Sequence, residues 1–204
     1  MRHTEEKVKN YFFISALVMC LIFPLSADAG GALDTVKSNA DKVLDVLRDP
    51  SLKSESARKI KRNRIRAIAQ KMFDFPELSK RTLAQNWGRF SLEQQKEFID
   101  LYTALLEDTY ADKIMAYTDE KIVFTNEVAL TEKTAEVRST VLRKTSEVPI
   151  NYRVILKDDG WRVYDVVIEG VSLINNYRTQ FREILTNKPP ASLLETIRKK
   201  VDKA

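Results

Sequence analysis

Apolar residues recur at helical spacing over the first half of the chain. Between Ser91 and Ala116 they fall every three or four residues, which is the period of one buried face of an α-helix. Ser91 is followed three residues later by Gln94, the spacing of a capping box at the start of this helix. The same periodicity predicts three earlier helices, over residues 32–48, 51–70 and 77–87.

From Lys121 onward the period changes to two. Four runs rich in β-branched and aromatic residues follow one another with short connections, which favours an antiparallel sheet of four strands. The pair Asp159-Gly160 supports a tight hairpin between the last two strands. We expect the strands over residues 121–130, 134–144, 148–157 and 161–168.

The segment 161–181, WRVYDVVIEGVSLINNYRTQF, is expected to run from the last strand straight into a helix. Gly170 permits a turn that bulkier residues resist, and Ser172 can cap the helix that follows. The strand is apolar on both faces, so either protein covers both faces or one face lines a cavity. Strict alternation places Arg162, Tyr164, Val166 and Ile168 on one face and Trp161, Val163, Asp165 and Val167 on the other. A final helix is predicted over residues 191–201.

Residues 1–29 have the pattern of a signal peptide. Basic residues precede the apolar run Tyr11–Leu25, and Ala27-Asp28-Ala29 fits the rule of small residues at the cleavage site. An uncleaved membrane anchor is the alternative, although the run is shorter than the ~20 residues that a span needs. We therefore predict an exported protein with one domain over residues 30–204, made of a helical part (32–117), a sheet (121–168) and C-terminal helices (172–201).

Candidate catalytic chemistry is sparse. The single histidine, His3, and the single cysteine, Cys20, both lie in the predicted leader. The remaining chain therefore has no histidine base, no cysteine nucleophile and no ordinary zinc or copper ligand set, and we expect no metal site. Asp165 and Glu169 near Tyr164 could form an acid–base pair. The favoured alternative is that Asp165 pairs with an arginine and Glu169 caps the next helix.

The chain is basic, with a formal net charge of +5. Its most basic stretch, residues 53–71, holds eight lysines and arginines and one acidic residue, Glu55. Such a run suits a solvated helix face, contact with an anionic lipid surface, or nucleic acid. Because no aromatic residues are interleaved with the charges, we expect no nucleic-acid partner.

Two blocks of sequence resemble one family. WRVYD at 161–165, followed by IEGVSLI at 168–174, is similar to the W-x-x-Y-D-x-x-x-E-G-V-S signature of the MlaC family of periplasmic phospholipid-binding proteins, also known as toluene-tolerance proteins. FDFPELSKRTLAQNW at 73–87, together with SLEQQ at 91–95, resembles the central helical block of the same family. The similarity runs in order over nearly the whole chain after residue 29.

The resemblance implies an α+β fold, with a four-stranded antiparallel sheet wrapped by about six helices around a deep apolar pocket that takes acyl chains. It implies a periplasmic carrier whose cargo is phospholipid and which needs no cofactor. The implied partners are an inner-membrane ABC transporter with a lipid-binding ring, an outer-membrane lipoprotein–porin complex and, transiently, a membrane surface. Such a carrier would maintain the lipid asymmetry of the outer membrane. The alternatives are a non-catalytic adaptor of the transporter and a small enzyme on the same scaffold.

Apolar residues of the helix after Ser91, of the strands and of the helix after Ser172 are the candidates to line such a pocket. For the helical residues, simple core packing is the alternative. We expect Glu169 and Gly170 to be a hinge, in which a side chain at position 170 would crowd the pocket mouth; a plain tight turn is the alternative. The candidate lining residues are Phe98, Leu101, Tyr102, Leu105, Val137, Val141, Tyr152, Val154, Tyr164, Val166, Ile168, Ile174 and Tyr177.

Overall fold

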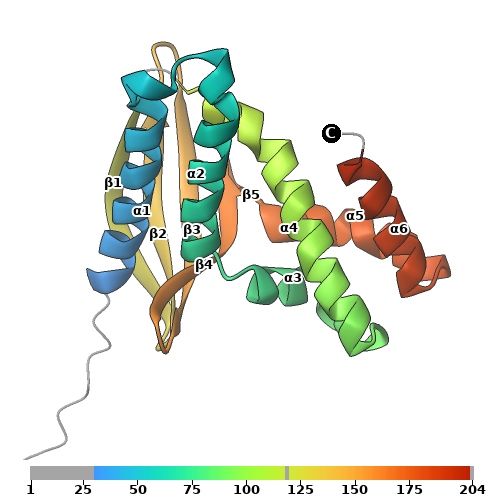
Figure 1. Ribbon diagram of the computed structural model, residues 1–204. Helices are drawn as coiled ribbons and strands as arrows, with labels where there is room; N and C mark the ends of the chain where they lie inside the picture. The colour runs from blue at the N-terminus through green and yellow to red at the C-terminus, as the bar shows by residue number, and fades with distance from the viewer. Residues whose placement is uncertain (1–29, 118–119, 203–204) are drawn as a thin grey trace, which may run out of the picture.

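A computed structural model describes residues 30–117 and 120–202, and its centre is an antiparallel sheet (Figure 1). The strands follow chain order across the sheet, so each pairs with its neighbour in sequence. The prediction of an antiparallel sheet is confirmed, and a two-residue fifth strand extends it beyond the four expected strands. The strands are β1 (Lys121–Thr131), β2 (Thr134–Leu142), β3 (Glu147–Lys157), β4 (Gly160–Ile168) and β5 (Val171–Ser172).

Within these described ranges six α-helices pack on and beside the sheet, and their boundaries differ most from the predicted ones at two places. The helix expected from residue 51 begins only at Arg58, because Asp49 and Ser54 cap two short 3-10 turns, Pro50–Leu52 and Glu55–Ala57, in front of it. The helix expected over 77–87 ends early and continues as the 3-10 segment Ala84–Arg89. The helices are α1 (Gly30–Arg48), α2 (Arg58–Met72), α3 (Phe75–Leu83), α4 (Leu92–Met115), α5 (Leu173–Asn187) and α6 (Pro190–Val201).

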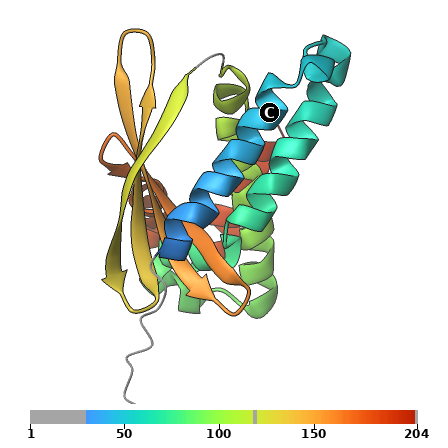
Figure 2. The same cartoon turned by 90° about the vertical axis from the view of Figure 1, so that its left-hand side faces the viewer.

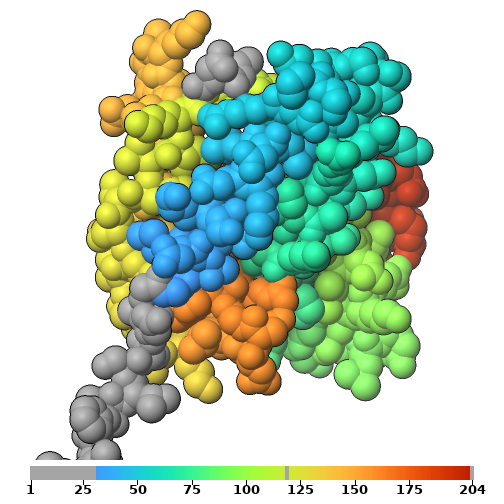
Figure 3. Space-filling model, turned by 60° about the vertical axis from the view of Figure 1, so that its left-hand side comes forward, coloured from blue at the N-terminus to red at the C-terminus, as the bar shows by residue number. Residues whose placement is uncertain are grey.

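The helices form two groups around the sheet. α1 and α2 lie side by side against one face, as the edge-on view shows (Figure 2). In the space-filling view the atoms of the two helices meet without a gap between them, and parts of the strands remain visible beside and below them (Figure 3). α3, α4, α5 and α6 form the second group beyond β4 and β5 (Figure 1), where α5 also contacts β4.

The second group is held together by an aromatic core. Phe98 and Tyr102 of α4 are fully buried and meet Tyr177 and Phe181 of α5, with ring centroids 5.2–5.7 Å apart. Aromatic pairs of this kind stabilise a core by about 0.5–1.5 kcal/mol beyond the burial of their area. The aromatic face predicted for the long helix is therefore real, and at this end of α4 it packs on other helices.

A β-bulge in β4 changes which residues share a face. Arg153 pairs with Asp165 and Val154 pairs with Val163, so Tyr164 is an extra residue with no partner on β3. An extra residue reverses the alternation of side chains beyond it. The face predicted by strict alternation is therefore wrong. Trp161 and Val163 pack in one cluster with Val166 and Ile168, whereas Tyr164 belongs to the aromatic core of the second group.

The bulge also connects β4 to the α2–α3 junction. The carbonyl oxygen of Val163 accepts a hydrogen bond of 2.8 Å from the backbone N–H of Asp74. Phe73, just before it, forms an isolated parallel bridge to Val163. The end of α2 is thus held at the centre of the molecule, where both helix groups meet the sheet.

Asp165 ties β4 to the start of α5. Its buried carboxylate accepts hydrogen bonds from the Ser172 hydroxyl at 2.7 Å and the Ile174 backbone N–H at 3.1 Å, and it pairs with Arg153 at 3.3 Å. Ser172 in turn accepts from the backbone N–H of Asn175 as the N-cap. The Tyr-Asp and Gly-Val-Ser parts of the signature are therefore joined in space by one hydrogen-bond network.

Glu169 and Gly170 form the two-residue turn between β4 and β5. Both have positive φ, 50° and 82°, and the residues on either side, Ile168 and Val171, pair across the turn. Positive φ at both positions is the signature of a tight hairpin turn. A Cβ atom at position 170 would meet nothing within 4 Å, so the expected crowding of a pocket mouth is wrong, whereas a role as a hinge stays a prediction.

Candidate functional site

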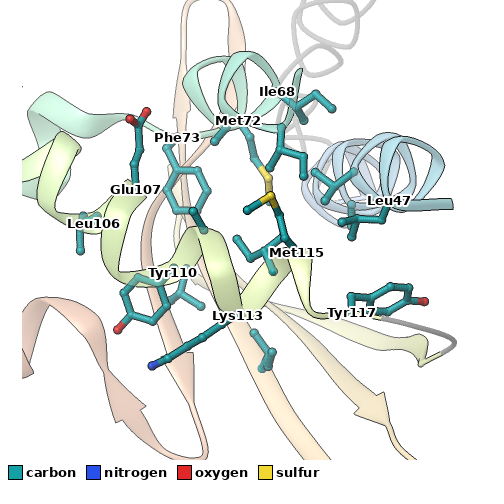
Figure 4. Close-up of a pocket in the computed structure, with 18 of the residues that line it drawn as sticks. Leu47, Ile68, Met72, Phe73, Leu106, Glu107, Tyr110, Lys113, Met115 and Tyr117 are labelled. Atoms are coloured by element: carbon teal, nitrogen blue, oxygen red, sulfur yellow. The ribbon is translucent and has the colours of Figure 1, made fainter. Parts of the chain in front are cut away.

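An apolar cavity of about 670 Å³ lies between the sheet, the α1–α2 pair and the C-terminal half of α4. This volume is within the range of about 300–1,000 Å³ found for ligand pockets. Figure 4 shows how side chains from different elements meet in it: Met72 at the end of α2 and Met115 of α4 extend into the same space, and Phe73 lies beside them. The wall is dominated by aliphatic and aromatic side chains, with a few charged groups at defined places.

The lining follows from how each helix is amphipathic. α2 carries Ile65, Ile68, Ala69 and Met72 on the side that faces the cavity, three or four residues apart. α4 is 24 residues long, so its two halves have different surroundings. Its first half is buried in the aromatic core, and only its second half, from Leu106 to Met115, reaches the cavity.

The structure brings four of the thirteen candidate lining residues to the cavity: Val141, Tyr152, Val166 and Ile168. They come from three neighbouring strands and share the cavity face of the sheet. The other candidates lie elsewhere. Val137 and Val154 are fully buried under α1, and the remaining seven belong to or pack against the aromatic core of the second group: Phe98, Leu101, Tyr102, Leu105, Tyr164, Ile174 and Tyr177.

Sequence reasoning missed the contributions of α1, α2 and the end of α4. The apolar stripes of these helices were recognised, but a stripe shows only that a face is covered, and a cavity wall and a packed core give the same pattern. The missed residues that define the far wall are Leu44, Leu47, Ile68, Met72, Phe73, Tyr110, Ile114 and Met115.

Tyr152 is a polar residue on the sheet side of the cavity. Burial raises the pKa of its phenol to about 12, and a hydrogen bond with Ser139 partly opposes this rise. Its ring stacks on Phe124 with centroids 6.4 Å apart. The phenol therefore stays neutral at physiological pH and adds a hydrogen-bonding group to an otherwise apolar wall without adding charge.

One end of the cavity is charged and open to solvent. This end, which we call the mouth, is lined by Lys113, Tyr117 and Arg143, with Glu120 next to Tyr117, and both cations are exposed. The Lys113 ammonium lies 5.2 Å from the centre of the Tyr110 ring. Within residues 30–117 and 120–202, neither Lys113 nor Arg143 has an acidic side chain at ion-pair distance. The mouth thus offers two cations to a negatively charged group.

The basic stretch of α2 is used within the molecule. Arg58, Arg62 and Arg66 pair with Asp112, Asp108 and Glu107 of α4, and Arg64 pairs with Asp49. We call the three pairs between the two helices the α2–α4 seam. The sequence reading of this stretch as a solvated face or a lipid-binding surface did not include this role, because the acidic partners lie some 50 residues away in sequence.

The innermost pair of the seam borders the cavity. Arg66 donates to Glu107 at 2.7 Å, and both residues line the cavity wall. The other carboxylate oxygen of Glu107 is buried and has no hydrogen-bond partner in the described part of the chain. Burial raises the pKa of Glu107, although Arg66 opposes the shift. The seam therefore closes the cavity at this side with an incompletely paired carboxylate.

The two carboxylates considered as an acid–base pair do not share a cleft. Asp165 is buried and fully occupied by its three partners, whereas Glu169 is exposed on the turn and does not cap α5. In the ranges that the structure describes, no three histidine, cysteine or acidic side chains gather where a metal ion could be held. None of the described helices is long and apolar enough to cross a membrane. The predicted leader lies outside the described residues.

The sheet, the two helix groups and the apolar space between them define a class of α+β proteins that enclose a ligand-sized cavity. The chain belongs to the MlaC family, because the sequence model of the MlaC protein family matches residues 37–199. The resemblance recognised in the sequence signature is thereby confirmed.

Two relatives agree with this assignment. The intermembrane phospholipid transport system binding protein MlaC of Haemophilus influenzae is 27% identical over 101 residues, which is 47% of this chain and 47% of that protein. The chain thus matches about half the length of that relative. A solved structure of a phospholipid-binding protein from Ralstonia solanacearum, in complex with a phospholipid, is similar with a TM-score of 0.74 and 26% identity, over 84% of this chain and 97% of that one.

Proposed function

We propose that this protein binds a phospholipid with its acyl chains in the cavity and its head group at the mouth. The observation that carries the proposal is the apolar cavity of about 670 Å³ in a fold similar to that of a protein solved with a phospholipid bound. The mouth of the cavity, with the cations Lys113 and Arg143, suits a phosphate group. This arrangement separates an apolar tail from an anionic head as a phospholipid does.

The energy scale favours an enclosed cavity over a surface groove. Removing a lipid chain from a bilayer costs about 0.8 kcal/mol for each CH₂ group that becomes exposed to water. Exposed ion pairs contribute only about 0–1 kcal/mol each, so they cannot compensate for two chains. The apolar wall built by α1, α2, α4 and the sheet supplies the compensation, and the cations of the mouth orient the head group.

The biological role that we propose is transport across the periplasm. After export and cleavage of the leader behind Ala29, the carrier would exchange lipid with an inner-membrane ABC transporter that holds a lipid-binding ring and with an outer-membrane lipoprotein–porin complex. This exchange would maintain the lipid asymmetry of the outer membrane. Intact mass of the exported protein tests the cleavage, since a mass that includes Cys20 would contradict it.

A matched pair of substitutions on one helix tests lipid binding. Ala69 of α2 lines the cavity, whereas Ala67, two residues earlier, is exposed. Ala69→Trp should fill the space for the acyl chains and abolish co-purified phospholipid, while Ala67→Trp should retain it. The readout is organic extraction of the purified protein followed by mass spectrometry.

The proposal fails if the unmodified protein contains no phospholipid and takes up none from vesicles. An empty protein that still bound the two membrane complexes would be an adaptor. Melting curves of both tryptophan variants are needed beside the extraction, because loss of lipid counts only where Ala69→Trp remains folded.

A further inference from the structure

The α2–α4 seam has an unusual composition for a contact between two helices that wall an apolar cavity. Three arginines of α2, spaced one turn apart, pair with three acidic residues of α4. The two helices are antiparallel, so the residue numbers rise along α2 while those of the partners on α4 fall. The helices are close where α2 begins and α4 ends, and they diverge from there (Figure 1). The exposure of the acidic side chains falls along the seam, from 73% for Asp112 to 14% for Glu107, whereas all three arginines stay partly exposed.

The apolar side chains of both helices turn away from the seam. Ile68 and Met72 of α2 and Leu106 and Tyr110 of α4 line the cavity between the helices. Figure 4 shows Met72 and Tyr110 on opposite sides of that space, with Glu107 directed away from Tyr110. Among the described residues, the apolar cluster that includes Ile65 of α2 reaches α4 only at its last residue, Met115. Between Glu107 and Asp112 of α4, the side chains that face the arginines of α2 are held by the ion pairs of the seam.

Such a contact differs in kind from the other helix contacts of the protein. α4 and α6 are joined through buried leucines and aromatic residues in addition to the ion pair of Glu97 with Arg198. Separating those helices would expose apolar surface to water, which is costly. Separating α2 from α4 along the seam would return charged groups to water, where each pair is worth little. Opening the seam therefore breaks mainly ion pairs, whereas separating α4 from α6 would break a packed apolar contact.

From these observations we propose that the α2–α4 seam is a lateral portal through which acyl chains enter and leave the cavity, held shut by the ion pairs Arg62–Asp108 and Arg66–Glu107. This inference rests on the proposed function, because it assigns a route to the same ligand. A chain that leaves sideways does not have to be drawn along the whole cavity to the mouth. Opening also exposes Arg62 and Arg66 at the cavity edge, where they can pair with the phosphate of the passing lipid in place of the two carboxylates.

Cross-linking the seam tests the portal directly. In a Cys20→Ser background, which removes the only cysteine of the chain, we would introduce Arg62→Cys with Asp108→Cys and join them with a bis-maleimide whose spacer contains a cleavable disulfide. The matched control is Glu97→Cys with Arg198→Cys, which replaces another arginine–acid pair, between α4 and α6, and takes the same reagent. Mass spectrometry and melting curves establish linkage and folding in both proteins.

The assay is the uptake of pyrene-labelled phosphatidylglycerol from vesicles of phosphatidylethanolamine and phosphatidylglycerol. We expect the linked seam to slow uptake about tenfold or more, which corresponds to about 1.4 kcal/mol added to the barrier. Cleaving the spacer should restore the rate, and the linked control should exchange as fast as the unlinked protein. Asp108→Asn, which removes the middle pair, should speed uptake, whereas Glu97→Gln should not.

The outcomes separate the two proposals. If the unlinked protein takes up no lipid, the proposed function fails and the portal with it. If the unlinked protein takes up lipid and the linked seam does so at the same rate, lipid binding stands and the lateral portal is refuted. Slowing by both cross-links alike also refutes the portal, because the effect would then not belong to the seam.

Discussion

Replacing Asp165 by alanine should destabilise the protein more than any other loss of a single carboxylate in the sheet. The change removes an acceptor of three interactions: the Ser172 hydroxyl, the Ile174 backbone N–H and the Arg153 guanidinium. Hydrogen bonds to charged groups contribute about 1.5–3 kcal/mol each and are not fully additive. Arg153 keeps a second partner, Glu136 at 3.4 Å, so the loss comes mainly from the two donors of the α5 start.

We estimate the loss of unfolding free energy at about 3–4 kcal/mol, below the sum of the separate bonds. For a domain of this size each kcal/mol lowers the melting temperature by about 2–4 °C, so Asp165→Ala should lower it by about 6–16 °C. Asp45→Ala is the control, because Asp45 is exposed on α1 and should change the stability by less than about 0.5 kcal/mol. Thermal unfolding followed by circular dichroism measures both.

The hydrogen bond between Asp165 and Ser172 gives a second check. Ser172→Ala removes the N-cap of α5 and should cost about 1–2 kcal/mol by itself. The double variant should lose less than the sum of the two single variants, because they share one bond. The reasoning is refuted if Asp165→Ala melts within about 2 °C of the Asp45→Ala control, or if the two losses simply add.

Three further predictions concern other parts of the molecule. Burial raises the pKa of Glu107 above its ordinary value of 4.5, so the folded state binds a proton on this carboxyl group more tightly than the unfolded state does. The protonated carboxyl group therefore stabilises the folded state at low pH, and this stabilisation is lost as the pH rises from 4.5 through the raised pKa. Glu107→Gln should lack this part of the fall in melting temperature between pH 4.5 and neutral pH, and an unchanged pH profile would contradict the assignment. Gly170→Ala should lower the free energy of unfolding, measured with denaturant, by about 1–2 kcal/mol, because φ at this position is 82°. If the folded variant takes up lipid from vesicles more slowly, Gly170 acts as a hinge; if the rate is unchanged, the glycine only forms the turn. Leu193→Ala on α6 should lower the free energy of unfolding by about 2–5 kcal/mol, since Leu193 is fully buried. The control Leu92→Ala should change it by less than about 0.5 kcal/mol, because Leu92 is 79% exposed. Equal losses of stability in the two variants would show that the aromatic core does not depend on α6.

The sequence predicted where helices and strands lie better than it predicted which of them contact one another. Alternation over residues 121–168 was enough for the sheet, because one face of each strand is covered and the turns are short. The capping box at Ser91 likewise placed the start of α4 correctly. These features depend on residues that are close together in sequence.

The site depended on distant residues, and there the sequence was less informative. The apolar face of α4 is continuous, so nothing in its periodicity separates Tyr102, which is core, from Tyr110, which lines the cavity. The difference arises because α5 and α6 cover only the first half of the helix. The arginines of α2 find their acids on α4, and that pairing is set by the fold and not by spacing.

The bulge at Tyr164 has a consequence for how the strand tolerates insertions and deletions. The face of β4 that packs against α1 holds Trp161 and Val163 before the bulge and Val166 and Ile168 after it, and the last two line the cavity. Deleting one residue between Val163 and Val166 would restore simple alternation, and the side chains on one side of the deletion would then point to the opposite face of the sheet. The count of residues in this part of the signature is thus a geometric constraint in its own right: exchange of one apolar side chain for another is a local event, whereas a change of length would carry Asp165, and with it the start of α5, to the wrong side of the sheet.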